Sequence, residues 1–349
     1  MYLEEIFIKK DISIREAIKK LDVTAKKILL VVEDDVLIGT VTDGDVRRWI
    51  LKNGDLSFQV HNIMNKTPTS VPIKEKHLAK QYMKNKGIES VPIVDDKNKI
   101  LDIVFWNDDV DLAINKFEKV SSPVVIMAGG KGTRLYPYTK ILPKPLIPIG
   151  EFSITERIIT RFTKFGCENF YLTVNYKKNM IKAYFDELDK DYQMSYIEEE
   201  KFLGTAGSLY LLKGKINETF FVSNCDILIE ANYSDILAYH KENNNLITMV
   251  TSLKNYKIPY GVIKLGNNGR VVGTIEKPEY DYLVNTGFYV LEPETLEDVP
   301  ENTFFHITDL INRYIDRGKK VGTYPIMENA WLDMGEINEM DRMMERLKL

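Results

Sequence analysis

Hydrophobic positions in the first 120 residues repeat in the same order, at an offset of roughly sixty residues. Residues 12–21 begin as an extended segment and continue with apolar positions at helical spacing, and residues 71–83 do the same. Residues 28–46 then predict a β-branched strand, an acidic turn, a second strand and the start of a helix, and residues 90–110 predict this series again. Because neither copy buries enough surface alone, we expect two βα units that pack face to face.

From residue 123 onward, short apolar runs typical of strands alternate with segments of helical spacing. The predicted strands are 123–128, 169–176 and 219–229, and the predicted helices are 153–166, 179–188 and 234–244. This alternation favours βαβ crossovers and a Rossmann-like α/β fold with a mixed, mostly parallel sheet, preceded by the small α/β pair. Ligands of such sheets bind at the carboxyl ends of the strands.

The segment Ser121–Ser122–Pro123 separates the two patterns. It follows an amphipathic stretch at 111–120 and precedes a new apolar strand. We therefore predict one domain over residues 1–120 and a second over residues 121–349.

Composition limits the classes of protein that remain. The 349 residues are 44% hydrophobic and 28% charged, as in a soluble globular protein of two or three domains. The formal net charge of −4, without a dense run of Lys or Arg, argues against nucleic acid or an anionic membrane as a partner. Cys167 and Cys225 lie far apart and outside any CxxC pattern, which argues against a disulfide framework or a thiolate zinc site.

The sequence also lacks features of export. Its first residues include acids and no apolar stretch with a cleavage site, so we expect no secretory signal. No apolar run approaches the length needed to cross a bilayer. The expected location is the cytoplasm.

The predicted strand 123–128 runs into a glycine-rich loop. Gly129, Gly130 and Gly132 allow the backbone to approach a ligand closely and to turn its amide groups toward phosphate oxygens. The loop is not a Walker A motif, and Leu135 stands where a dinucleotide motif has its third glycine. The pattern predicts an anion-binding loop of another kind.

Cations and prolines follow the glycines. Arg134 and Lys144 are the two cations that can meet a polyphosphate, and the prolines around Lys144 stiffen the loop, so that little ordering is lost on binding. Residues 129–148, GGKGTRLYPYTKILPKPLIP, resemble the signature of sugar-1-phosphate nucleotidyltransferases, approximately GGxGTRLxPxTxxxPKPxxP. This resemblance implies catalytic roles for Arg134 and Lys144. It implies a nucleotide site that includes Ala128, Gly129, Gly130, Gly132 and Thr133.

The same resemblance implies a magnesium site. In the segment VSNCDILI at 222–229 an apolar strand ends on Asp226, and Asp333 lies in the segment WLDMG at 331–335. Both resemble the aspartates with which the family holds Mg²⁺, a hard cation that prefers one or two carboxylates plus phosphate oxygens. Asp226 therefore counts as both a catalytic residue and a metal ligand, and Cys225 stands where many relatives have glycine.

Two further pockets are implied by the family's motifs. The segment KFLGTAGSLYLL at 201–212 resembles the family's LGTAG segment, which lies along the base and sugar of the nucleotide, and it contributes Gly204 and Thr205. The segment TIEKPE resembles the EKP motif, in which Glu276 accepts sugar hydroxyls and Lys277 neutralises the phosphate. The implied sugar-phosphate site consists of Gly261, Glu276, Lys277, Asn285 and Gly287.

The first 120 residues resemble a tandem pair of CBS domains, a module that commonly binds nucleotides between its repeats. Gly39, Thr42 and Asp45 carry the resemblance, and Thr42 and Asp45 are the candidate regulatory nucleotide contacts. The second copy departs from the pattern, because Asp102 falls near the glycine position. Thr42 and Asp45 also suit the cap of a helix, and both roles are compatible. CBS pairs often associate, so a homo-oligomer is an expected assembly.

The implied reaction is attack by a sugar 1-phosphate on the α-phosphorus of a nucleoside triphosphate, with release of pyrophosphate. The combination with a CBS pair resembles enzymes that make GDP-glucosamine for legionaminic acid and bacterial surface glycans, which favours GTP and glucosamine 1-phosphate. Mannose-1-phosphate guanylyltransferase and other uridylyl- or thymidylyltransferases are alternatives. Alternatives from other classes are an inactive nucleotide-sensing CBS protein, a nicotinamide oxidoreductase and a phosphocholine-type cytidylyltransferase.

Overall fold

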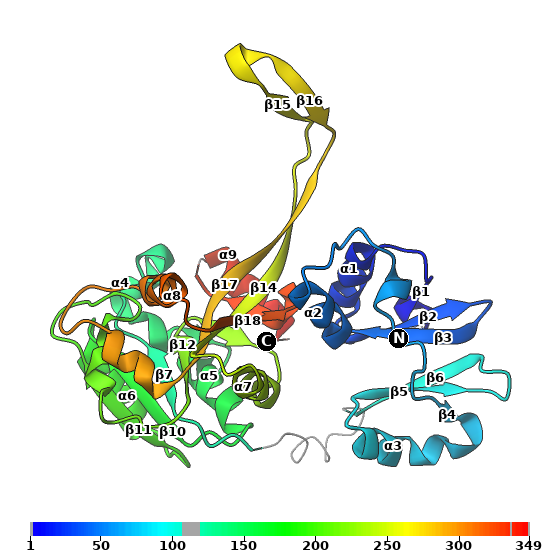
Figure 1. Cartoon of the computed structure of the whole chain (residues 1–349). Coiled ribbons are helices and arrows are strands. Elements are labelled where there is room, and N and C mark those ends of the chain that lie inside the picture. The colour runs from blue at the N-terminus through cyan, green and yellow to red at the C-terminus, as the bar shows by residue number, and fades with distance from the viewer. Residues whose placement is uncertain (1–2, 107–118, 336, 348–349) are drawn as a thin grey trace. The chain divides into compact units, whose positions relative to one another are not determined.

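Two copies of one βα topology form the N-terminal part of the computed structural model, which describes residues 3–106, 119–335 and 337–347. The chain divides into two compact units, residues 1–118 and 119–349 (Figure 1). In these described ranges no helix is long and apolar enough to cross a membrane.

The first unit has two three-stranded sheets of identical topology. In each copy the first strand runs parallel to the second, and the second pairs antiparallel with the third. The first copy consists of η1 (Leu3–Ile6), β1 (Phe7–Ile8), α1 (Ile14–Thr24), β2 (Ile28–Glu33), β3 (Val36–Thr42) and α2 (Asp43–Leu51), followed by η2 (Val60–Asn62). The second consists of β4 (Val71–Pro72), η3 (Ile73–Leu78), α3 (Ala79–Lys86), β5 (Ser90–Val94) and β6 (Ile100–Phe105).

The two copies contact each other through their hairpin turns. The Leu37 amide donates to the Asn98 carbonyl at 3.0 Å, and the Ile100 amide donates to the Asp35 carbonyl at 3.1 Å. The Lys26 ammonium lies 5.0 Å from the centroid of the Phe105 ring. The helix start predicted near residue 110 and the amphipathic stretch at 111–120 fall mostly outside the described residues.

The second unit is built on one seven-stranded sheet in the order β11-β10-β7-β12-β17-β14-β18. Every neighbouring pair is parallel except the two pairs made by β17, so the predicted mixed and mostly parallel sheet is confirmed. The strands are β7 (Val124–Met127), β10 (Asn169–Val174), β11 (Gln193–Glu198), β12 (Phe220–Asn224), β14 (Ile247–Lys257), β17 (Glu279–Leu291) and β18 (Val321–Ile326).

Helices and short strand pairs surround this sheet. The α-helices are α4 (Tyr138–Ile141), α5 (Ile154–Thr163), α6 (Lys178–Glu187), α7 (Tyr233–Glu242), α8 (Ile307–Asp316) and α9 (Ile337–Arg346). The 3-10 turns are η6 (Thr133–Leu135), η7 (Lys144–Leu146), η8 (Gly207–Leu212), η9 (Asn267–Gly269), η10 (Pro293–Asp298) and η11 (Glu328–Ala330). The strand pairs are β8 (Pro148–Ile149) with β9 (Phe152–Ser153), β13 (Ile227–Ile229) with β19 (Trp331–Asp333), and β15 (Val262–Leu265) with β16 (Val271–Ile275).

The strand predicted over 219–229 is wrong as a single element. The chain leaves the main sheet after Asn224, and Ile227–Ile229 forms β13 in a separate sheet with β19. The apolar pattern does not reveal this break because residues on both sides of it are buried.

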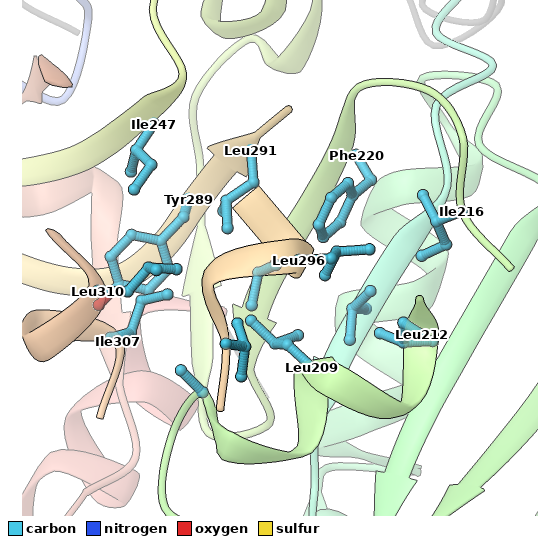
Figure 2. Close-up of a cluster of buried hydrophobic side chains, with 14 of the residues drawn as sticks. Leu209, Leu212, Ile216, Phe220, Ile247, Tyr289, Leu291, Leu296, Ile307 and Leu310 are labelled. Carbon is cyan, nitrogen blue, oxygen red and sulfur yellow. The ribbon is translucent and has the colours of Figure 1, made fainter. Parts of the chain in front are cut away.

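Hydrophobic clusters cover both faces of the main sheet. On one face, Leu209 and Leu212 of η8 pack with Phe220 and with Leu310 of α8 (Figure 2). Phe221 points to the opposite face, because successive residues of a strand alternate. There it packs in an aromatic group around Phe162, whose members are Phe162, Phe170, Phe221, Tyr233 and Phe288.

Two strands extend beyond the sheet as a ribbon, defined here as residues 253–283. β14 pairs with β17 without interruption from Thr251–Asn285 to Lys257–Glu279, while β18 stops at Ile326, opposite Ser252. The hairpin of β15 and β16 forms the end of this ribbon, which projects from the body of the unit (Figure 1).

We expect Phe162→Ala to lower the free energy of unfolding of the second unit by about 3–5 kcal/mol, because Phe162 is fully buried and contacts four aromatic rings. Denaturant unfolding measures the change. Phe152→Ala is the control: this ring is 51% exposed, and its removal should cost less than about 0.5 kcal/mol. Equal losses in the two variants would contradict the assignment of the core.

Candidate functional site

The carboxyl ends of four parallel strands, β7, β10, β11 and β12, meet at one edge of the sheet. Hydrogen bonds join the residues that follow these strands. The Ala128 amide donates to the Thr173 carbonyl at 3.0 Å, and the Asn175 side chain donates to the Glu199 carbonyl at 2.8 Å. This is the edge at which α/β sheets bind ligands.

The glycine loop folds back onto the proline-flanked lysine. Gly132 has a φ of +63°, and a Cβ there would lie 2.9 Å from the Thr139 side chain and 3.0 Å from the Lys144 Cβ. The Thr139 hydroxyl donates to the Gly132 carbonyl at 2.9 Å. Only glycine accepts both the left-handed backbone and this close approach, which holds Lys144 beside the loop.

Lys144 forms a buried ion pair with Asp226. The Lys144 ammonium contacts the Asp226 carboxylate, and the two side chains are only 12% and 10% exposed. Asp226 occupies this position because the chain turns between β12 and β13. Its neighbour Cys225 is also buried, which raises the pKa of the thiol to about 12 and leaves it protonated and unreactive.

Pairing between β13 and β19 brings Asp333 next to Asp226. Ile227 is opposite Asp333 in the ladder, and the Met334 amide donates to the Asp226 carbonyl at 2.8 Å. Burial, and then the negative charge of Asp226, raise the pKa of the Asp333 carboxyl.

Arg134 completes this group. A Cβ on Gly335 would lie 3.1 Å from an Asp333 oxygen and 3.5 Å from an Arg134 nitrogen, so both side chains lie beside this glycine. The structure therefore brings together four side chains, which we call the charged cluster: Arg134, Lys144, Asp226 and Asp333.

The charged cluster suits a divalent cation of the magnesium type. Burial, and after it repulsion from the neighbouring Asp226 carboxylate, raise the pKa of Asp333, and a bound cation would relieve the repulsion. In the described part of the chain no three His, Cys, Asp or Glu side chains form a metal cage. Two carboxylates with phosphate and water oxygens match the coordination that Mg²⁺ prefers.

The segment that contains Gly204 and Thr205 is clamped against a second loop. A Cβ on Gly204, whose φ is +84°, would lie 2.6 Å from the Phe305 carbonyl oxygen. The amides of Ala206 and Gly207 both donate to that oxygen at 3.0 Å, and the Thr205 hydroxyl accepts from the Ile307 amide at 3.0 Å. These glycines therefore have a packing role within the chain, at the edge next to Glu199.

Glu199 is a residue of this edge that the sequence analysis missed. Its side chain is almost completely buried, and its carboxylate accepts from the Leu203 amide at 3.1 Å. A Cβ on Gly129 would lie 2.5 Å from the other carboxylate oxygen, so the group faces the glycine loop. Burial raises the pKa of Glu199. Its position directly after β11 could have indicated the site, but it lies within a run of three glutamates that looks solvent-exposed.

Asn285 and Gly287 lie at a β-bulge near the charged cluster. Gly287 has a φ of +87°, and a Cβ there would overlap the side chain of Asn224, two residues before Asp226. The Gly287 amide donates to the Asn285 side chain at 3.1 Å, and the Asn285 side chain donates to the Tyr289 hydroxyl at 2.7 Å.

The other predicted sugar contacts lie far along the ribbon. Gly261 and Glu276 are neighbours, since a Cβ on Gly261 would lie 3.0 Å from the Glu276 carboxylate, and Lys277 follows with its side chain exposed. Gly287 and Glu279 are eight residue steps apart along strand β17, which corresponds to about 25 Å. The structure therefore does not bring Glu276 and Lys277 to the charged cluster of the same chain.

In the first unit, Thr42 and Asp45 form a capping box at the start of α2. The Thr42 amide donates to the Asp45 carboxylate at 2.8 Å, and the Asp45 amide donates to the Thr42 hydroxyl at 3.4 Å. Arg48 pairs with the same carboxylate. The capping role is therefore present, as the sequence allowed. In the second copy, Asp102 instead pairs with Lys76 at 2.6 Å.

The close approach at Gly287 gives a test of the geometry. We expect Gly287→Ala to destabilise the second unit by more than the roughly 1–3 kcal/mol of a strained backbone position, because its Cβ would also displace Asn224. Gly214→Ala is the control, since Gly214 has a φ of +71° but open space around it. Denaturant unfolding compares the two variants, and equal losses would show that Gly287 does not press on Asn224.

Comparison with known families agrees with this geometry. The nucleotidyl transferase family model matches residues 123–348, and the CBS domain model matches residues 3–52. The chain therefore belongs to the nucleotidyl transferase family and carries an N-terminal CBS domain. The second copy of the βα unit lies outside the matched CBS range but shares its topology.

The curated relatives include proteins with different named substrates. The bifunctional protein GlmU of Methanococcus maripaludis strain C7 is 34% identical over 221 residues, which is 60% of this chain and 51% of that protein. The mannose-1-phosphate guanylyltransferase catalytic subunit beta of Dictyostelium discoideum is 32% identical, over 50% of this chain and 51% of its own length. The chain thus spans about half the length of these relatives.

A solved structure shows the same fold. HddC from Yersinia pseudotuberculosis superposes with a TM-score of 0.52 at 21% identity, over 65% of this chain and 99% of that chain.

Proposed function

We propose that the protein transfers a nucleotidyl group from a nucleoside triphosphate to a sugar 1-phosphate and releases pyrophosphate. The observation that carries this proposal is the convergence of the glycine loop with the charged cluster at the carboxyl edge of the sheet. Two cations and two carboxylates beside a phosphate-binding loop suit phosphoryl chemistry, which depends on positioning and charge neutralisation.

In this reaction, an oxygen of the sugar phosphate forms a bond to the α-phosphorus while the bond from that phosphorus to pyrophosphate breaks. The amides of the glycine loop orient the triphosphate, and Arg134 stabilises the charge on the departing pyrophosphate. Lys144, which pairs with Asp226, also reaches the reacting phosphates. No general base is needed because the attacking phosphate is already an anion.

Asp226 and Asp333 are the residues that would hold Mg²⁺, which supplies positive charge to the phosphate oxygens when it is bound. These neighbouring carboxylates repel each other, and Lys144 and Arg134 offset only a part of this repulsion, which a bound cation would lower further.

Glu199 supports GTP as the triphosphate. A carboxylate accepts hydrogen bonds and donates none. Guanine presents two adjacent N–H donors on its Watson–Crick edge, whereas uracil and thymine present one N–H between two carbonyl oxygens that a carboxylate would repel. The relatives include guanylyltransferases, and they also include a uridylyltransferase of Synechocystis that is 28% identical. For the sugar we propose glucosamine 1-phosphate, with mannose 1-phosphate as the alternative.

Pyrophosphate release tests the proposed reaction. The protein is incubated with Mg²⁺, each of the common triphosphates and a panel of sugar 1-phosphates that includes glucosamine and mannose 1-phosphate. We expect release with GTP and glucosamine 1-phosphate. Absence of release with every pair would overturn the enzyme proposal and favour an inactive nucleotide sensor.

Glu199→Gln tests the choice of base. A glutamine both donates and accepts, so we expect the preference for GTP over UTP, compared as kcat/KM, to fall by about 10- to 100-fold, the value of one charged hydrogen bond. In the wild type, the KM for GTP should rise as the pH falls toward the raised pKa of Glu199, because the accepting carboxylate is lost on protonation. This pH dependence should be absent in the variant.

Glu200→Gln is the matched control, because Glu200 is exposed and its substitution should leave both the preference and the pH profile unchanged. An unchanged preference in Glu199→Gln would exclude Glu199 as the group that reads the base.

For the first unit we propose that a regulatory nucleotide binds beside Thr42 and Asp45. We expect AMP, ATP, GDP or GTP to raise the unfolding temperature of the full chain, with a part of the shift lost in Thr42→Ala. Ser13→Ala is the control, since Ser13 forms the same capping box at α1, and it should keep the full shift. Identical shifts in both variants would leave the first unit without a nucleotide role.

A further inference from the structure

Exposed apolar side chains are concentrated on the ribbon and its hairpin. Among the described residues, 21 large apolar side chains are strongly exposed, and nine of these lie between positions 256 and 283. They include Tyr260 at 74%, Leu265 at 67% and Val272 at 62% exposed. Such a concentration on one projecting element marks a surface that contacts another molecule.

Among the described residues of its own unit, the ribbon has no covering layer. β15 pairs only with β16, so both outer edges of the hairpin carry unpaired backbone groups. A two-stranded hairpin is marginally stable in water, and open edges favour pairing with a further chain. The ribbon therefore gains stability when a surface packs against it.

The ribbon also carries the part of the proposed site that the charged cluster lacks. Gly261, Glu276 and Lys277 match the sugar-phosphate motif, yet they lie beyond about 25 Å of strand from the bulge at Gly287. The ladder between Thr251–Asn285 and Lys257–Glu279 is uninterrupted, so folding the tip back onto its own cluster would break it. One chain thus has the phosphate-binding cluster without an adjacent Glu276 and Lys277.

We propose that the ribbon docks on a second copy of this chain and that its Glu276 and Lys277 complete the sugar-phosphate pocket of that copy. This inference rests on the proposed function. The partner is a second copy of this chain because Glu276 and Lys277 match the sugar-phosphate motif of the same site to which the charged cluster belongs. In a two-fold dimer each ribbon enters the site of the other subunit, so both sites are completed by one contact.

Complementation between two inactive variants tests the shared site. Arg134→Ala removes a group of the cluster, and Glu276→Ala removes a group of the ribbon. Each variant alone should lose most of its pyrophosphate release. Co-expressed with different tags, the two should form mixed dimers in which one site contains both native groups, which restores about a quarter of the wild-type activity.

Two pairs serve as controls that should not complement: Arg134→Ala with Asp226→Asn, both in the cluster, and Glu276→Ala with Lys277→Ala, both on the ribbon. Mixed dimers that co-purify without recovered activity would overturn the shared site. Full activity of a wild-type monomer at assay concentration would overturn it as well.

The assembly itself is measured by sedimentation, which does not depend on activity. Ile263→Asp places a charge on the hairpin and should shift the chain from dimer to monomer, whereas Ile315→Asp on α8, at a similar exposure of 54% against 52%, should not. An unchanged dimer in Ile263→Asp would overturn docking through the ribbon. If the wild type dimerises through the ribbon but releases no pyrophosphate with any substrate pair, the proposed function fails and the docking stands.

Discussion

The buried ion pair between Lys144 and Asp226 is the contact on which the arrangement of the candidate site depends. Lys144 belongs to the loop after β7, and Asp226 belongs to the turn after β12, so the pair joins two neighbouring strand ends. A charge removed from water is stable only beside its partner, and loss of one partner of such a pair typically costs about 3–5 kcal/mol. The loop is therefore held where its amides can meet a ligand before any ligand arrives.

Around this pair, the chain keeps like charges close together. Asp333 lies beside Asp226 because β19 pairs with β13, and burial, followed by the charge of Asp226, raises the pKa of the Asp333 carboxyl. Arg134 offsets a part of this repulsion. Shifted pKa values produced by burial and neighbouring charges are common at functional sites. Glu199 adds a second buried carboxylate at the same edge, on the side of the glycine loop.

The ribbon and the first unit follow from a different constraint, which is the limited surface that a small element can bury. Each three-stranded βα copy can bury only a small core, such as the one around Val71, Met83 and Ile93 in the second copy, and the two copies contact each other through their turns. The ribbon, with β15 and β16 at its end, has no such second layer within the described residues of its own unit. Its exposed apolar side chains therefore favour contact with another molecule. This contact connects the proposed assembly with the proposed chemistry.

The sequence by itself determined the local features: alternating strands and helices that predict a parallel sheet, the capping box at Thr42, and the glycine loop with its two cations. These local features depend on periodicity and on the backbone freedom of single residues. Both are properties of short segments and need no contact with distant parts of the chain. Only the tertiary structure decided that the run 219–229 breaks at Asp226, that Asp333 lies beside it, that Glu199 faces Gly129, and that Glu276 lies far from the cluster of its own chain. Those positions result from pairing between strands distant in the chain, and no local pattern records which strands will pair.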